Sequence, residues 1–393
     1  MSAATGAHDL AGRVVWRPAM SASGGALHNE RPDLVPRVAT GRPATQLPAL
    51  MASLLSLCGP AHRLASQLAV DAAQGRPSVL TTEAQRQHQL DTLAEHVRRI
   101  WLDWPRWASL GGAVLAPPPA LTECPALQAP PTPGLTTQRL DDTRQWLVEH
   151  VLGMAPQLWL AGWHAEGETW LHHWAASAPT WPAQWMQAVR PPAQVLLMNC
   201  HPWWPDEPAL LALAEQLSRD PECARQPPWP VAAVETGPWC RLHDRARLCR
   251  LTGRTVSAWW RLGGRLADLA RLCLPDDARE AHGRHALQHG SLHGPMPHSA
   301  LAWIEMARGT LLHWVWLDGP AADARVRASQ VVAPTEWNFH GDGPVARLLA
   351  SLPAGPWMHR DAALAVAAWD PCVPFVIDPA DTSTDRPTEN AHA

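Results

Sequence analysis

Apolar side chains recur every three or four residues in segment after segment of this chain, and this spacing places them along one face of an α-helix. The segments that show it are residues 45–73, 84–104, 142–154, 207–219, 254–274, 345–352 and 360–369. A different pattern occupies residues 309–319 and 324–335, where apolar and β-branched residues on both sides of a Gly-Pro turn predict a β-hairpin. The chain is therefore expected to be mainly helical, with minor β structure that includes a short strand near residues 12–16.

Composition restricts the classes of protein to which the chain can belong. Of its 393 residues, 46% are hydrophobic and 17% are charged, which is typical of a globular chain. The net charge of −4 provides no basic surface for nucleic acid. No run of about 18 apolar residues predicts a membrane span. The N-terminus lacks the charged start and apolar core of a secretory signal, so we expect a cytoplasmic protein whose eight cysteines are reduced thiols.

Two segments are expected to lie outside regular structure. The proline-rich stretch near residues 116–134 cannot form helix or sheet and is predicted to be a loop. Residues 379–393 are polar and short, and we expect them to form a disordered tail.

Cys58 is the first candidate for chemistry. It precedes Gly59-Pro60, and proline is tolerated in the first turn of a helix, so we expect Cys58 at a helix N-terminus, where the helix dipole favours thiolate over thiol. His62 follows one turn later on the same face. This pair is either a thiolate metal ligand supported by a histidine, or a small buried cysteine beside a surface histidine.

Three further residues stand at the ends of predicted elements. Cys372 lies between two prolines after a helix, so its thiol is held stiffly and is either a metal ligand or a structural cysteine of a tight loop. Arg308 precedes a predicted strand and either holds an anion in a cleft or is simply solvated. Thr335 follows Pro334 at the end of a strand, where its hydroxyl either donates to a ligand or caps a turn.

The segment 282–298 carries five histidines, at positions 282, 285, 289, 293 and 298. Neutral imidazole ligates nickel, zinc or copper readily. However, the segment contains glycine and proline and shows no regular metal-ligand spacing, so we expect a solvated loop. Transient handling of nickel is the alternative.

Taken in order, several segments resemble the signature segments of the large subunit of nickel–iron hydrogenases. They are GRPATQLPALMASLLSLCGPAH, ETGPWCRL, GRTVSAWWRLGGRLADLARL, EMARGTLLHWVWLDG, VVAPTEWN and AAWDPCVPF. Within that family the chain is most similar to the HupK/HoxV-type hydrogenase expression/formation proteins, which are degenerate relatives of the large subunit. The resemblance implies an α+β, mainly helical fold, with a core of long helices and small flanking β parts. It also implies that residues 1–378 form a single intertwined domain.

The departures from the catalytic family decide what the resemblance implies about function. That family holds a nickel–iron pair with two Cys-x-x-Cys pairs, whereas here Leu55 stands in place of one cysteine of the first pair and Phe375 in place of one cysteine of the last. Asp378 replaces the histidine at which the family is processed, and GRVVWRPAM contains no acidic match to the family's N-terminal glutamate. We therefore expect neither hydrogenase activity nor bound nickel, and we predict that the chain is not an enzyme.

The residues that do match the catalytic family imply binding of iron without nickel. Cys58 and Cys372 would ligate the iron of an Fe(CN)2(CO) fragment, with His62 beside Cys58, while Arg308 and Thr335 match the residues that hold the cyanides in the catalytic family. Because Cys372 aligns with a terminal nickel ligand, its loop would have to move to reach iron.

The chain is accordingly predicted to be a scaffold or carrier in hydrogenase maturation that binds this fragment transiently. General hydrogenase maturation factors would deliver the fragment, and the apo large subunit would receive it. One alternative is a metal-free mimic of the large subunit that docks hydrogenase subunits or maturation factors. The third hypothesis is a nickel donor that uses the histidine segment.

Overall fold

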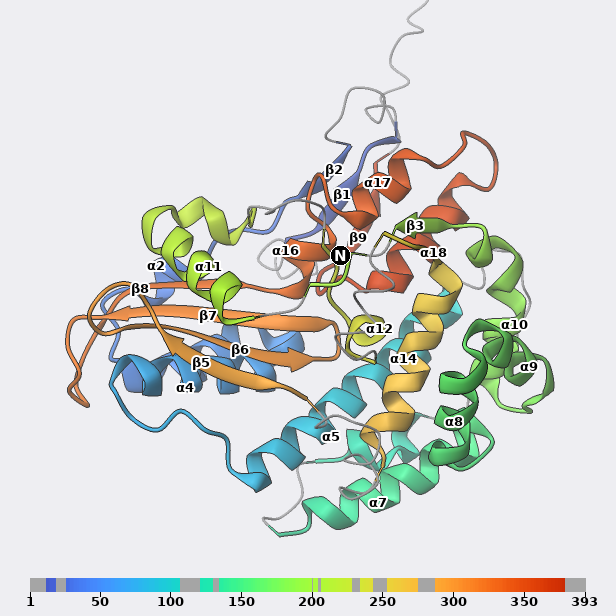
Figure 1. Ribbon diagram of the computed structural model, residues 1–393, viewed down its shortest axis with the longest axis horizontal. Helices are drawn as coiled ribbons and strands as arrows, with labels where there is room; N and C mark the ends of the chain where they lie inside the picture. Colours follow the sequence, from blue (N-terminus) through green and yellow to red (C-terminus); the bar gives the residue numbers. More distant parts are fainter. Residues whose placement is uncertain are drawn as a thin grey trace, which may run out of the picture.

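A four-stranded antiparallel sheet forms one side of the molecule (Figure 1). Its strand order is β5 (His289–His293), β6 (Ser299–Met306), β7 (Gly309–Leu317) and β8 (Val326–Val332). β7 and β8 form the predicted hairpin, in which Leu312 pairs with Val332. The computed structural model describes residues 12–18, 26–106, 121–129, 134–199, 201–203, 206–227, 234–242, 253–274 and 287–378.

Both faces of this sheet are buried because its side chains alternate between two helical layers. Leu311 and Val315 of β7 belong to an apolar cluster with α3 (Leu47–Leu54) and α4 (Gly59–Ala73). Leu312 and Trp314 point to the opposite face and pack with α11 (Glu207–Arg219). In Figure 1 the sheet lies between α4 and α11.

The other side of the molecule is helical and is organised around α14 (Ala258–Leu272), which is buried on nearly all sides. The helices on this side pack their apolar faces, including many tryptophans, into one large cluster. They are α5 (Thr82–Arg98), α7 (Thr136–Leu147), α8 (Pro156–Glu166), α9 (Glu168–Ser177), α10 (Trp181–Gln194), α12 (Pro238–Arg241), α17 (Pro344–Ala350) and α18 (Met358–Trp369). Gly264 of α14 permits close packing on α12, since a Cβ there would lie 2.9 Å from the Cβ of Trp239.

Two small sheets join segments that are distant in the sequence. β1 (Val14–Trp16) pairs antiparallel with β2 (Leu27–Asn29) and parallel with β9 (Phe375–Ile377). β3 (Leu197–Asn199) pairs antiparallel with β4 (Thr255–Ser257). The last described strand of the chain is therefore bound to the first one. Short helices complete the architecture at α2 (Val35–Ala39) and α16 (Pro334–Asn338).

The mainly helical α+β fold is confirmed, and so are the hairpin, most helices and the strand predicted near 12–16, which is observed at Val14–Trp16. Three expectations need correction. Residues 255–257 form β4, so the helix predicted over 254–274 begins later, at Ala258. The helices predicted over 84–104 and 142–154 each change to a π-helical turn, at Arg99–Asp103 and Val148–Leu152. The histidine segment is in part the strand β5 rather than a loop.

Other expectations fall wholly or partly outside the described residues. The tail 379–393 does so, as do residues 116–120 and 130–133 of the proline-rich stretch and the histidines at 282 and 285. Leu121–Glu123 and Pro125–Leu127, within that stretch, are short 3-10 turns. The six described cysteines are all free thiols. Among the described helices, none combines the length and apolar character needed to cross a bilayer.

Candidate functional site

Cys58 lies at the N-terminus of α4, as predicted. α3 ends at Leu54, a 3-10 turn covers Ser56–Cys58, and α4 begins at Gly59. This turn is tight because a Cβ on Gly59 would lie 2.7 Å from the carbonyl oxygen of Ala52, so only glycine fits. The side chain of Cys58 is buried.

Cys372 lies in the irregular segment between α18 and β9, as its two flanking prolines predicted. Thr335, at the start of α16, contacts it twice. The Thr335 hydroxyl donates to Cys372 Sγ at 3.0 Å and accepts from the backbone nitrogen of Cys372 at 3.1 Å. Thr335 therefore holds the cysteine by both its sulfur and its backbone.

The two cysteines line one cavity of about 150 Å³. His62 and Leu55 line it as well, so the two ends of the chain bring both candidate thiols to a common space, one of whose walls is an apolar leucine. Phe375 instead lines an adjoining cavity of about 500 Å³, which Cys372 also borders.

Arg308 directly precedes β7, as predicted, and its side chain is buried at 1% exposure. Gly309 follows with φ of 133°, a conformation that side chains rarely adopt. A Cβ at position 309 would also lie 2.7 Å from the side chain of Thr236. The glycine thus allows the chain to turn into the strand while Arg308 points inward.

Arg308 contacts a thiol and two carboxylates. Its Nη1 donates to Cys58 Sγ and to Glu95 Oε2, each at 3.2 Å, and its Nε lies 3.3 Å from Asp370 Oδ2. Burial opposes the guanidinium charge, but Asp370, Cys58 and Glu95 outweigh it and raise the pKa of Arg308. Its Nη2 is buried and has no hydrogen-bond acceptor among the described residues. This donor is therefore available to a ligand.

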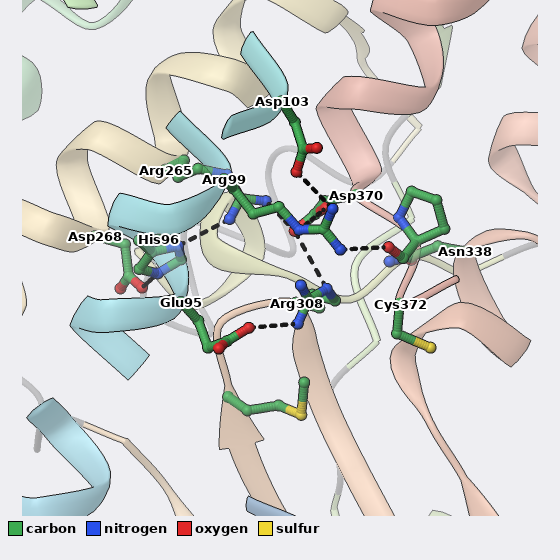
Figure 2. Close-up of polar contacts among 12 residues, drawn as sticks. Glu95, His96, Arg99, Asp103, Arg265, Asp268, Arg308, Asn338, Asp370 and Cys372 are labelled. Atoms are coloured by element: carbon green, nitrogen blue, oxygen red, sulfur yellow. Dashed lines mark hydrogen bonds and ion pairs between the residues drawn. The ribbon is translucent and has the colours of Figure 1, made fainter. Parts of the chain in front are cut away.

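Asp370 anchors the segment that carries Cys372 (Figure 2). Its carboxylate forms ion pairs with Arg99 and Arg265, each at 2.9 Å, besides the contact with Arg308. Burial favours the neutral carboxyl, yet the three guanidinium groups outweigh burial and lower the pKa of Asp370 to about 2. Arg99 Nη2 also donates to the carbonyl oxygen of Pro371 at 3.0 Å. The backbone before Cys372 is therefore held by the π-helical turn that follows α5.

His62 is buried against a second histidine. Its Nδ1 lies 2.9 Å from Nε2 of His313, and the two rings meet edge to face. Burial lowers the pKa of both, to about 3 for His313 and well below the usual value for His62. Both rings are therefore neutral, and one nitrogen of the pair donates to the other.

The expected thiolate state of Cys58 is wrong for the metal-free chain. Burial raises the pKa of Cys58 to about 12; Arg308 opposes this shift, whereas negative charge on Cys372 and Glu95 adds to it. The helix N-terminus is present, but it does not compensate for the loss of solvent around the sulfur. A metal ion would have to displace the thiol proton.

Arg31 and Glu336 also line the cavity, although no local sequence pattern indicated them. Arg31 Nη1 forms an ion pair with Glu336 Oε1. The second carboxylate oxygen of Glu336 accepts from the backbone nitrogen of Ala333 at 2.9 Å, which ties the pair to the start of α16. Cys372, Glu336 and Cys58 outweigh burial and raise the pKa of Arg31.

The histidine segment shows no metal site where it is described. His289 and His293 lie on β5, and His298 is in the turn before β6. Within the described ranges, no group of three or more His, Cys, Asp or Glu side chains is placed to hold a metal ion. The cavity of Cys58 and Cys372 offers two thiols.

Comparison with known proteins identifies the class. The chain is 37% identical to the hydrogenase expression/formation protein HoxV of Cupriavidus necator, over 96% of this chain and 97% of that protein. It is 29% identical to the hydrogenase expression/formation protein HupK of Bradyrhizobium diazoefficiens, over 88% of this chain and 90% of that protein. No protein-family model matches the chain. The chain belongs to the family of HoxV- and HupK-type hydrogenase expression/formation proteins.

Solved structures give a weaker likeness. A crystal structure of an NAD+-reducing [NiFe]-hydrogenase superposes with a TM-score of 0.46 and 16% identity, over 88% of this chain and 91% of that one. The Ni-Fe-Se hydrogenase from D. vulgaris Hildenborough gives 0.48 and 14%, over 88% and 92%. The family assignment rests on the sequence relatives.

Proposed function

We propose that this chain is a carrier for the Fe(CN)2(CO) fragment during maturation of a nickel–iron hydrogenase. The observation that supports this most directly is that Cys58 and Cys372 line one cavity. Each sulfur accepts a hydrogen bond from a buried donor, Arg308 in one case and Thr335 in the other. Two thiols from opposite ends of the chain thus line the same cavity.

The residues around the thiols suit a fragment that carries hydrogen-bond acceptors. Arg308 has a buried Nη2 donor without an acceptor, and a cyanide nitrogen is a strong acceptor. A hydrogen bond from a charged donor contributes about 1.5–3 kcal/mol when the site excludes water. The Thr335 hydroxyl now donates to Cys372 Sγ and would be freed for a second cyanide if the sulfur turned toward iron.

The ligands of this cavity also explain why binding of the fragment would be temporary. Leu55 occupies the wall where the resemblance places a further cysteine, so the cavity supplies two sulfur ligands. A recipient with four thiolates binds the metal more strongly and would draw the fragment away. The protein would receive the fragment from general maturation factors and pass it to the apo large subunit, and it would catalyse no reaction itself.

The deciding experiment is infrared spectroscopy of the protein purified from cells that also express the maturation factors. Cyanide and carbonyl stretching bands should be present, and they should be absent in Cys58→Ala and in Cys372→Ala. Cys124→Ala is the matched control, because Cys124 is a buried free thiol like Cys58 but packs in a different apolar cluster. That variant should keep the bands.

Two results would contradict the proposal. Full bands in both cavity-cysteine variants would reject these ligands. A protein without bands, whose two cysteines can be replaced while hydrogenase maturation continues, would instead be a metal-free mimic of the large subunit.

A further inference from the structure

The strand β9 lies at the edge of its sheet. The strand order is β2, β1 and β9, so β9 pairs with β1 on one side, and no described strand pairs with it on the other. Its residues, Phe375–Ile377, are apolar and only partly buried. Proteins often protect a free strand edge with a charge or a proline, because such an edge can pair with another chain. β9 contains neither within its length.

The hydrogen bonds to β1 show which backbone groups of β9 face outward. The amide of Val14 donates to the carbonyl oxygen of Pro374 at 2.9 Å. In a parallel ladder, residues that bond to one neighbour alternate with residues that face away, so Val376 also bonds to β1. The amides and carbonyl oxygens of Phe375 and Ile377 therefore point away from β1. No other described segment bonds to these four groups.

The edge strand shares a cavity with one of the two candidate thiols. Residues Asp370–Phe375 and Ile377 line this cavity, which has a volume of about 500 Å³. Cys372 is among them, so the cavity extends from β9 to the sulfur. A volume of this size lies within the range of about 300–1,000 Å³ that is typical of ligand pockets. The cavity therefore has room for side chains of a docked segment.

An extended polypeptide is the ligand that such an edge recognises. Main-chain hydrogen bonds to the free edge provide affinity, while alternate side chains of the added strand enter neighbouring pockets and provide specificity. Ala363 and Val366 of α18 give this cavity an apolar wall. Arg106 also lines it, and its side chain is 78% exposed. The segment that fits is therefore apolar at alternate positions and carries an acidic residue that meets Arg106.

The sequence that follows β9 is poorly suited to fold back onto this edge. It begins with Asp378-Pro379, and the two-residue turns that join adjacent antiparallel strands require positive φ values. Proline fixes φ near −65° and cannot adopt them. A segment of another protein is the better candidate.

We propose that the outer edge of β9 docks an extended segment of the apo large subunit that receives the iron fragment. This inference rests on the proposed function and names the surface used for transfer. The recipient has to bring its own thiolates to the iron while this chain still holds it. Of the two thiols, Cys58 is buried and Cys372 only partly so, which makes Cys372 the ligand open to exchange. A segment paired with β9 lies beside Cys372, because both border one cavity.

The first test is amide hydrogen exchange at single-residue resolution in the parent protein, alone and with apo large subunit purified from cells that lack the maturation factors. In the free protein, the amides of Phe375 and Ile377 should exchange quickly, whereas that of Val376 should be protected by β1. The apo large subunit should slow exchange at Phe375 and Ile377 by at least about tenfold and leave Val376 unchanged. Unchanged exchange at both outward amides in the complex would overturn the inference.

The second test removes one outward amide. Ile377→Pro lacks the N–H group that faces away from β1, and proline is tolerated on an edge strand in this orientation. Ile377→Ala is the matched control, because it loses the same side chain but keeps the amide. In calorimetric titrations, Ile377→Pro should bind the apo large subunit roughly tenfold more weakly than Ile377→Ala. Equal affinities would contradict pairing along β9, and if Ile377→Pro does not fold, the exchange measurement decides without a variant.

Two other occupants of the edge give distinct results. If a chain that ends at Asp378 shows faster exchange at Phe375 and Ile377 than the full chain, the chain's own residues 379–393 cover the edge. If protection at these amides rises with the concentration of the protein alone, a second copy covers it. Either result would overturn docking of the large subunit.

The infrared experiment is independent of these measurements. Cyanide and carbonyl bands without slower exchange at β9 would reject the docking site and leave the carrier function intact. Slower exchange at β9 in a protein without bands would support the docking site while removing the proposed cargo.

Discussion

Replacing Asp370 by asparagine should destabilise the protein far more than a typical change from Asp to Asn. The carboxylate neutralises Arg99, Arg265 and Arg308, and the side chains of the last two are at most 4% exposed. Removing one member of a buried ion pair costs about 3–5 kcal/mol, because the remaining charge is left buried without compensation. We expect the free energy of unfolding to fall by at least this amount.

Asparagine is the appropriate substitution because it separates charge from backbone effects. Asp370 has φ of 54°, in the left-handed region, and asparagine adopts this region about as readily as aspartate. The loss of unfolding free energy in Asp370→Asn therefore measures the contribution of the carboxylate charge rather than backbone strain at the end of α18. Alanine at this position would add a backbone cost of about 1 kcal/mol.

The assay is urea unfolding of the metal-free protein, followed by the fluorescence of its 23 tryptophans. Asp361→Asn is the control on the same helix, since Asp361 pairs only with the adjacent Arg360 among its described ion pairs. It should cost less than about 1 kcal/mol. If Asp370→Asn unfolds within that same range, the three-arginine anchor does not stabilise the protein as we argue.

Two further predictions concern stability. His88 is buried, which lowers its pKa from 6.5 to about 4, so in this window the unfolded chain binds a proton that the folded chain does not. The free energy of unfolding should therefore fall as the pH drops from 6.5 to 4, by up to about 3 kcal/mol from this residue, and His88→Gln should reduce that slope in urea titrations. Gly309→Ala should lower stability by about 2–3 kcal/mol, because a methyl group would collide with Thr236 in a strained backbone. Gly319→Ala, where a Cβ meets nothing within 4 Å, is its control in thermal unfolding, and an equal loss in both would contradict the steric argument.

Local patterns in the sequence predicted the elements that carry the site. The 3.6-residue period predicted α11 to its observed bounds, and the Gly-Pro pair at 59–60 predicted that a helix begins directly after Cys58. The prolines around Cys372 correctly excluded helix there. Each of these inferences uses residues that are neighbours along the chain.

The groups that surround the thiols could not be predicted in this way. Arg99 and Asp370 form an ion pair although 271 positions separate them, and neither residue departs from the surface pattern of its own helix or loop. The thiolate state of Cys58 was mispredicted for the same reason. Its pKa depends mainly on burial by distant segments, whereas the helix terminus is local.

The pairing of Val14 with Phe375 has a consequence for the order of events in the cell. A ribosome releases the first strand long before it adds the last one, and domains form as their partners emerge. The cavity shared by Cys58 and Cys372 therefore cannot close until the segment that carries Cys372 and β9 has been synthesised. A nascent chain that ends before this segment carries one thiol without its companion, so the two-thiol cavity forms late in synthesis.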